Sequence, residues 1–145
     1  PCTAEAVVWM LKENQIPIAG KRVVIVGRSL IVGKPLAMLM MKENGTVTVC
    51  HTKTADLPGT CRQAEILVAA AGRPELLNDD YVGEEAVVID VGIHVREDGK
   101  LCGDVDFDSI QEKAFAATPV PGGVGTVTTA VLAKHLVQAG LLLHR

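Results

Sequence analysis

A short apolar strand that runs straight into a glycine turn and a helix is the feature that most constrains this fold. Residues 22–26 read RVVIV, and a β-branched run without polar alternation predicts a strand buried on both faces. Gly27 closes the strand, and residues 34–43 then carry apolar side chains at helical spacing. Pro35 suits the first turn of that helix, and Gly45 is placed to end it. A strand, a turn and a helix in this order predict a βαβ unit of a parallel sheet.

The same alternation of strand and helix patterns continues along the chain. Further strands are expected at residues 46–50, 66–70 and 86–90, with an extended segment at 116–120. Further helices are expected at 3–14, capped by Thr3, at 107–114 and at 127–139, with a short helical or irregular segment at 56–63. Asp98 and Gly99 predict the turn of a small hairpin. We therefore expect one Rossmann-like, doubly wound α/β domain over residues 1–145, its mostly parallel sheet covered by helices on both faces.

Composition favours one domain with an aliphatic core and argues against several function classes. The 145 residues are 48% hydrophobic but only 3% aromatic, so Val, Leu, Ile and Ala must fill the core. A net charge of −3 without any run of basic residues argues against a nucleic-acid binder. The apolar runs are far shorter than the roughly 20 residues of a membrane-spanning helix, and no signal peptide is recognisable.

The four cysteines, at positions 2, 50, 61 and 102, form no Cys-x-x-Cys pair. We therefore expect neither a zinc site nor a disulfide framework, but buried or bystander thiols. Free thiols favour the cytoplasm, where disulfides are rare. The chain begins at Pro1 rather than Met and ends near an apolar run at 141–143, so we expect it to be a piece of a longer protein.

The loop from Gly27 to Pro35 is the sharpest candidate for ligand binding. A tight turn that ends on a helix N-terminus offers backbone N–H groups and a positive dipole end to a pyrophosphate. The usual Gly-x-Gly-x-x-Gly spacing is absent, because Ser29 stands where the second glycine would be. Taken alone, the loop leaves nucleotide binding and a purely structural turn both open.

The end of the second strand bears on which nucleotide would fit. NAD-preferring domains usually place an acidic residue there, about 20 residues after the glycines, to bind the ribose 2′-hydroxyl. Here residues 50–54 read CHTKT. Without an acid to repel a 2′-phosphate, and with Lys53 and Arg28 to attract one, NADP is favoured. The alternative is a solvated polar loop.

Two later glycine-containing segments follow strands, at the edge where open α/β sheets bind ligands. The first runs from Asp90 to Ile93. The second, residues 118–126, holds two prolines and three glycines within eight residues. A stiff loop of this kind suits a ligand wall and a structural turn equally well.

Six motifs, taken in order, resemble the bifunctional methylenetetrahydrofolate dehydrogenase/cyclohydrolase family. They are Pro-Cys-Thr before a helix, V-G-R-S-L-I-V-G-K-P, C-H-T-K-T, D-V-G-I, G-D-V-D-F and T-P-V-P-G-G-V-G, from residue 1 to about residue 140. The resemblance implies the NADP-binding domain of an enzyme that oxidises methylenetetrahydrofolate and hydrolyses the methenyl product. It also implies a homodimer that binds NADP and a tetrahydrofolate derivative in one-carbon metabolism.

The resemblance also assigns roles to individual residues. The cofactor-binding residues that it implies are Gly27, Arg28 and Ser29 for the phosphates, Thr52 with Arg28 for the 2′-phosphate, and Ile93 for the nicotinamide. The cleft loop that it implies, near cofactor and folate, consists of Pro121, Gly122 and Gly123. No metal ligand and no catalytic residue is expected in this chain.

The family's Tyr-x-x-x-Lys motif, whose lysine carries the proton chemistry, belongs to an N-terminal folate-binding domain. Here the single tyrosine, Tyr81, is followed four residues later by Glu85. We therefore expect the cofactor half of the enzyme, which binds NADP without turning over folate by itself. The first and last helices are expected to face the other domain through Val8, Trp9, Leu11 and residues 141–143. A free-standing dinucleotide-sensing module and a noncatalytic interaction domain are the alternatives.

Several polar residues carry weaker hypotheses. His51 suits either a general base or a local polar contact. His94, where many family members have Asn, suits either a hydrogen bond near the nicotinamide or a polar rim. Asp104, Asp106 and Asp108 have the oxygen chemistry of metal ligands, but their spacing reads better as a strand edge and a helix N-cap.

Overall fold

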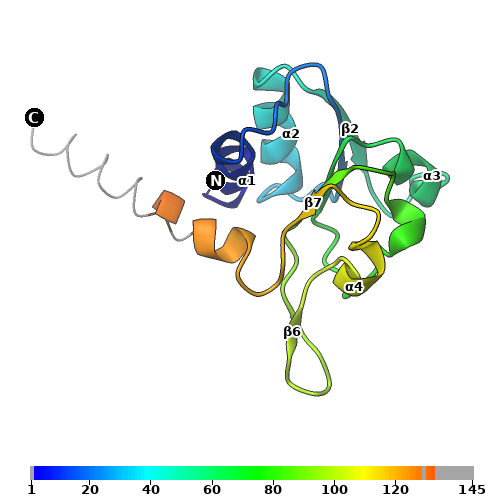
Figure 1. Ribbon diagram of the computed structural model, residues 1–145. Helices are drawn as coiled ribbons and strands as arrows, with labels where there is room; N and C mark the ends of the chain where they lie inside the picture. Colours follow the sequence, from blue (N-terminus) through cyan, green and yellow to red (C-terminus); the bar gives the residue numbers. More distant parts are fainter. Residues whose placement is uncertain (1, 129, 133–145) are drawn as a thin grey trace, which may run out of the picture.

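The computed structural model describes residues 2–128 and 130–132, and a five-stranded parallel sheet forms its centre (Figure 1). Across the sheet the strands are β2 (Thr46–Cys50), β1 (Arg22–Val26), β3 (Ile66–Ala69), β4 (Val87–Asp90) and β7 (Ala116–Ala117). Each neighbouring pair is parallel. The chain winds outward in both directions from β1, so the point where the strand order reverses lies between β1 and β3.

Helices cover both faces of the sheet, which confirms the predicted fold class (Figure 1). On one face lie α1 (Cys2–Glu13) and α2 (Gly33–Lys42), and on the other lie α3 (Leu57–Arg62), the 3₁₀ turn η1 (Asp79–Tyr81) and α4 (Phe107–Ile110). Successive residues of β1 alternate between the two layers: Val23 and Ile25 join the core under α1 and α2, whereas Val24 and Val26 join the other.

Of the three inner strands, β3 and β4 are buried along their whole length. This burial explains their continuous aliphatic sequence, because a parallel strand between two helical layers has no solvent face. The edge strand β2 is different, since four of its five residues are at least partly exposed. Burial on both faces fixes the inner strands in register, so that their carboxyl ends meet at one common edge.

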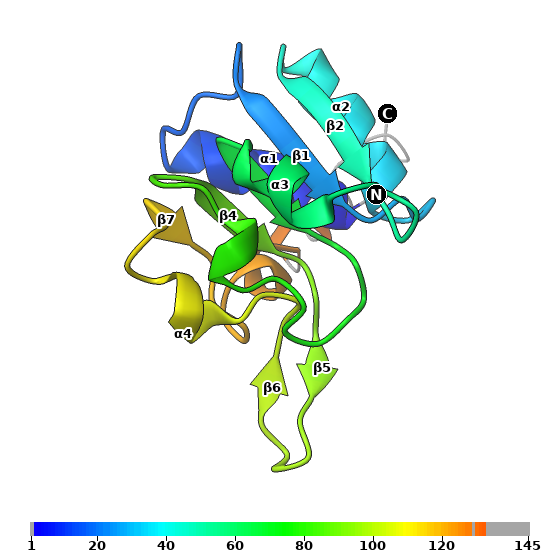
Figure 2. The ribbon, with the colours of Figure 1, turned by 90° about the vertical axis from the view of Figure 1, so that its right-hand side faces the viewer.

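The predicted hairpin is present and extends away from the sheet (Figure 2). Its strands β5 (His94–Val95) and β6 (Leu101–Cys102) are antiparallel. Gly99 has a φ of +83°, in the left-handed region, and its N–H donates to the carbonyl of Arg96 at 2.9 Å. The Asp-Gly turn signal therefore identified both the hairpin and its tip correctly.

Several predicted helix boundaries were wrong. α1 begins at Cys2, so Thr3 lies inside the first turn and is not the cap. At the end of α2 the left-handed residue is Asn44, with a φ of +68°, and Gly45 only donates its N–H to the carbonyl of Met40. α4 ends at Ile110 rather than at residue 114, and the extended segment after it forms ladder pairs only in β7.

The last helix also starts earlier than predicted. It begins at residue 124 rather than 127 and is described at 124–128 and 130–132. The remaining part of the predicted span, 133–139, lies outside the described residues, as does the apolar run at 141–143. The glycine-rich loop therefore leads directly into a helix.

The apolar face of α1 packs within this domain. Val8 and Leu11 are buried in the same core as α2, with Leu11 fully inaccessible. Trp9 is 43% exposed. Of the three α1 residues expected to face another domain, Trp9 alone presents apolar surface, so the expected patch is smaller than the sequence indicated.

All four cysteines are free, and three of them, Cys50, Cys61 and Cys102, are buried. Burial raises the pKa of the Cys61 thiol to about 12 and also raises the pKa of Cys50. Thiols with such pKa values stay protonated at neutral pH. Residues 2–128 and 130–132 include no group of three or more His, Cys, Asp or Glu side chains able to hold a metal ion. None of the helices within that part of the chain is both long and apolar enough to span a membrane.

Two methionines of α2 test the assigned packing. Met40 is fully buried and Met38 is 66% exposed. Met40→Ala should lower the free energy of unfolding by about 2–5 kcal/mol, because it leaves a cavity. Met38→Ala, the matched control, should change it by less than about 0.5 kcal/mol. Urea unfolding measures both, and equal losses would contradict the orientation of α2.

Candidate cofactor site

Two cavities lie along the carboxyl edge of the sheet. The first, of about 440 Å³, lies over the ends of β1 and β3 and is lined by residues that include Gly27, Arg28, Ser29, Thr52, Ala71 and Arg73. The second, of about 300 Å³, follows the end of β4 and lies between residues 90–93 and the loop at 119–126. The first cavity is at the point where the strand order reverses, which is where doubly wound sheets bind their ligands.

The turn after β1 is held by very close backbone packing. Gly27 has a φ of +131°, and a Cβ at this position would overlap the carbonyl group of Ala70, at the end of β3. A Cβ at Gly33, the first residue of α2, would in turn overlap the carbonyl of Gly27. Both positions therefore require glycine. The turn brings the ends of two strands and the start of a helix together around one point.

Ser29 shapes the rest of this turn. Its hydroxyl accepts the N–H of Val32 at 3.0 Å, and its carbonyl accepts the N–H of Lys34 at 2.9 Å. Val32 itself, at the N-cap position of α2, provides no side-chain cap. The serine thus orders the loop that leads into the positive end of the helix dipole, although the second glycine of the usual motif is missing.

The segment after β2 forms a compact polar turn beside the first cavity. The N–H of His51 donates to Thr54 Oγ1 at 2.8 Å, and the N–H of Lys53 donates to His51 Nδ1 at 3.1 Å. The imidazole is therefore engaged as a local polar contact. Thr52 lies between these residues and lines the cavity together with Arg28. Of the described residues that line this cavity, none is acidic.

The second cavity is lined by the predicted site residues that lie in the second half of the chain. Ile93 is 62% exposed and lines the cavity with Pro121, Gly122 and Gly123. The loop is anchored to the sheet by Thr118, whose hydroxyl accepts the backbone N–H of Asp90 at 2.8 Å. Of the predicted site residues, the first cavity therefore holds Gly27, Arg28, Ser29 and Thr52. The second cavity holds Ile93 and the three loop residues.

Two buried carboxylates had no predicted role as site components, although Asp90 itself lines the second cavity. Asp90 is 4% exposed and Asp104 is fully buried. Asp104 follows β6 but is buried, and Asp106 occupies the N-cap position of α4, as predicted, without making a side-chain cap hydrogen bond. His94 Nε2 lies 2.7 Å from Asp104 Oδ1, so this ring is not simply a polar rim residue.

Two glycines leave the space that these carboxylates occupy. A Cβ at Gly92 would overlap the Asp104 carboxylate, and a Cβ at Gly103 would overlap that of Asp90. A glycine beside each aspartate leaves room for a carboxylate to turn inward. Burial raises the pKa of Asp90, while hydrogen bonds from the N–H groups of Val105, Asp104 and Gly92 partly oppose that increase.

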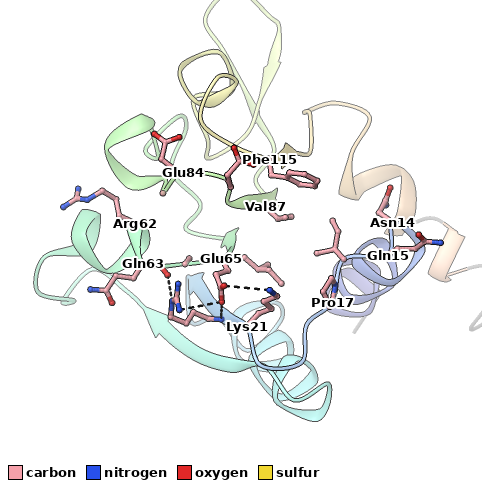
Figure 3. A pocket seen from close by; sticks show the side chains of 16 residues that line it. Asn14, Gln15, Pro17, Lys21, Arg62, Gln63, Glu65, Glu84, Val87 and Phe115 are labelled. Carbon is pink, nitrogen blue, oxygen red and sulfur yellow. Dashed lines mark hydrogen bonds and ion pairs between the residues drawn. The ribbon is translucent and has the colours of Figure 1, made fainter.

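A larger groove, of about 780 Å³, lies at the opposite edge, beside the amino ends of β1, β3 and β4 (Figure 3). Glu65 occupies its floor, where it accepts the N–H of Arg22 at 2.9 Å and lies 3.9 Å from Lys21 Nζ. The groove contains none of the predicted site residues. Its charged floor is already paired, and amino ends of parallel strands are not where such sheets bind nucleotides.

The reversal point, the glycine turn and the two cavities define a dinucleotide-binding domain of the doubly wound class. The family described as tetrahydrofolate dehydrogenase/cyclohydrolase, NAD(P)-binding domain, matches residues 1–142. The chain belongs to this family.

Sequence relatives and solved structures support the same family assignment. The bifunctional protein FolD of Carboxydothermus hydrogenoformans is 57% identical over 141 residues, which cover 96% of this chain and 49% of that protein. The FolD crystal structure from Campylobacter jejuni superposes with a TM-score of 0.93 at 46% identity, over 95% of this chain and 49% of that one. A FolD structure from Trypanosoma brucei, complexed with NADP cofactor and inhibitor, gives a TM-score of 0.85 at 44% identity, over 92% and 48%. The chain spans about half the length of the curated relatives it matches.

Two glycines test the tight turn. Gly20→Ala places a Cβ at a φ of +75°, near the left-handed region, which costs about 1–2 kcal/mol, whereas Gly27→Ala places one at a φ of +131°, which side chains avoid still more. The Cβ at Gly20 meets nothing within 4 Å, whereas the Cβ at Gly27 also overlaps the Ala70 carbonyl. Gly27→Ala should therefore lower the free energy of unfolding clearly more than Gly20→Ala. Denaturant titration measures the free energy of unfolding of both variants. Equal losses of this free energy would show that the turn is not closely packed.

Proposed function

We propose that this chain is the NADP-binding half of a bifunctional enzyme that oxidises methylenetetrahydrofolate and hydrolyses the methenyl product. The observation that carries the proposal is the first cavity, where the glycine turn, Arg28 and Thr52 lie together and no acidic side chain is among the described lining residues. FolD relatives, whose bifunctional activity is named for the whole protein, support the assignment of the reaction.

The residues present fit a dinucleotide. Gly27 and Gly33 let β1, the end of β3 and the start of α2 pack closely, and the positive end of the α2 dipole with its backbone N–H groups suits a pyrophosphate. Arg28 supplies a guanidinium, which suits a phosphate because it forms paired hydrogen bonds. Ile93, at the second cavity, supplies an apolar surface for the nicotinamide. NADP, when bound, accepts the hydride from the folate substrate.

The preference for NADP over NAD follows from charge. A ribose 2′-phosphate brings negative charge to the turn after β2, where Thr52 and Arg28 line the cavity and Lys53 lies between His51 and Thr54 in sequence. An acidic side chain at this place would instead bind the free 2′-hydroxyl of NAD. The proposal therefore assigns the 2′-phosphate to Arg28 and Thr52.

The proton chemistry of the folate step is assigned to another part of the enzyme. The single tyrosine of this chain, Tyr81, precedes Glu85 rather than a lysine at the fourth following position. We therefore propose that the 145 residues bind and orient the cofactor, while the folate derivative, a homodimeric partner and a cytoplasmic setting belong to the complete protein.

Calorimetric titration of the chain with NADP and NAD tests the cofactor assignment. NADP should bind at least about tenfold more tightly, equivalent to about 1.4 kcal/mol. Arg28→Gln should remove most of this preference by weakening NADP while leaving NAD nearly unchanged. Arg22→Gln, at the opposite edge, is the matched control and should leave both affinities unaltered. Equal affinities in the unaltered chain would contradict the 2′-phosphate site.

The division of labour predicts a second result. The chain incubated with methylenetetrahydrofolate and NADP should produce no reduced cofactor above background, because no lysine follows Tyr81 at the required spacing. Absorbance of the reduced nicotinamide measures this. Turnover by the 145 residues would show that the proton chemistry resides here, and the proposed division would fail.

A further inference from the structure

We infer that Asp104 is a positioning residue that joins the two halves of the cofactor site; the inference rests on the proposed function, in which one NADP molecule spans both cavities. Asp104 lines neither the glycine turn nor the second cavity. It lies behind both, fully buried, and acts through the backbone segments that it holds.

The Asp104 carboxylate fixes the loop after β3. Its Oδ2 accepts the N–H of Ala71 at 2.7 Å and that of Gly72 at 3.1 Å, and its Oδ1 accepts the N–H of Arg73 at 3.1 Å. Three consecutive backbone N–H groups thus converge on one side chain. Ala71 and Arg73 both line the first cavity, so the position of this wall depends on the carboxylate.

The same carboxylate reaches toward the second cavity. Its Oδ1 also accepts a hydrogen bond from His94 Nε2 at 2.7 Å, and His94 directly follows Ile93. With three backbone N–H groups already donating to it, this carboxylate serves as an acceptor, and the contact fits a His94 tautomer with its proton on Nε2. The His94 side chain is 20% exposed, which makes it a partly enclosed link between Asp104 and the nicotinamide side of the site.

Asp90 completes the link through the backbone. Its Oδ1 accepts the N–H of Asp104 at 3.0 Å and that of Gly92 at 2.9 Å, and its Oδ2 accepts the N–H of Val105 at 3.0 Å. Its own N–H donates to Thr118 Oγ1, at the start of the second cavity's loop. The two aspartates therefore connect the wall of one cavity to both walls of the other.

A carboxylate that holds a loop from a buried position must be fully hydrogen-bonded. Moving the Asp104 carboxylate out of water costs free energy, and the hydrogen bonds from three backbone N–H groups and His94 compensate for the lost hydration. An amide in the same place would present N–H₂ to at least one backbone N–H, so Asn cannot reproduce the pattern. Because a ligand that contacts both cavities requires their spacing to be fixed, loosening this joint should weaken such a ligand more than one that occupies a single cavity.

The test compares NADP with adenosine 2′,5′-bisphosphate, which carries the 2′-phosphate but lacks the nicotinamide half. The variants are Asp104→Asn and, as matched control, Asp108→Asn, whose carboxylate is exposed. By calorimetry, Asp104→Asn should weaken NADP by at least about tenfold and weaken the bisphosphate distinctly less. Asp108→Asn should change neither. Circular dichroism establishes that the protein is folded at the temperature of the titration.

His94 provides a second pair of variants that keeps both aspartates. His94→Ala removes one donor and should weaken NADP but not the bisphosphate. His94→Gln keeps an N–H donor and should restore most of the NADP affinity. This rescue would not occur if the histidine only filled space, and the pair decides the matter if Asp104→Asn does not fold.

Three outcomes are distinguishable. If the unaltered chain does not bind NADP, the proposed function fails and this inference fails with it. If the unaltered chain binds NADP but folded Asp104→Asn loses affinity for both ligands equally, or for neither, the proposed function stands and the positioning role of Asp104 is overturned. A selective loss for NADP, with rescue by His94→Gln, supports the inference.

Discussion

The close approach of Gly27 to the end of β3 is the contact on which the ligand-binding edge depends. The Ala70 carbonyl lies where the Cβ of any other residue at position 27 would be, and Gly33 packs against the Gly27 carbonyl in the same way. These two contacts set the distance between β1, β3 and the start of α2. The dipole end of the helix, the first cavity and the reversal of strand order all coincide because the backbone can turn this tightly.

Two buried carboxylates then fix the loops at the carboxyl edge of the sheet, next to the glycine turn. Asp90 and Asp104 are the two buried charged side chains of the described structure, and both are directed at backbone N–H groups. Each carboxylate occupies space that a neighbouring glycine leaves open. Glycines therefore have two roles here. Gly27 and Gly33 let the strands and the helix approach closely, and Gly92 and Gly103 leave space for the two carboxylates. The aliphatic cores on both faces of the sheet supply the burial that makes these hydrogen bonds strong.

Sequence reasoning predicted the parts that depend on local pattern. The RVVIV strand and the hairpin at Asp98 and Gly99 follow from a hydrophobic run and from turn chemistry, which a reader of the sequence can see directly. The pairing of Arg28 with Thr52, which line one cavity, was implied by the family resemblance. The prediction was less successful where tertiary contacts decide. Leu11 faces this domain's own core rather than an absent neighbour, because α2 crosses the same sheet face.

Buried polar partners were beyond the reach of the sequence for a related reason. Asp104 meets residues 71–73 across more than thirty positions of chain, and no local spacing announces that contact. Helix ends were misplaced by a few residues, since Asn44 can adopt the left-handed conformation that was assigned to Gly45. The resemblance to a known family supplied residue roles, but it did not indicate what holds those residues in place.

We propose that NADP binds at the carboxyl edge of the sheet and not in the larger groove at the amino edge. Titration of the isotopically labelled chain with NADP, followed by backbone amide NMR, distinguishes the two edges. We expect shifts at the amides of residues 27–33, 51–54, 71–73 and 92–93, with residues 14–22 and 62–66 unaffected. Saturable shifts confined to the amino edge, around Lys21 and Glu65, would contradict it.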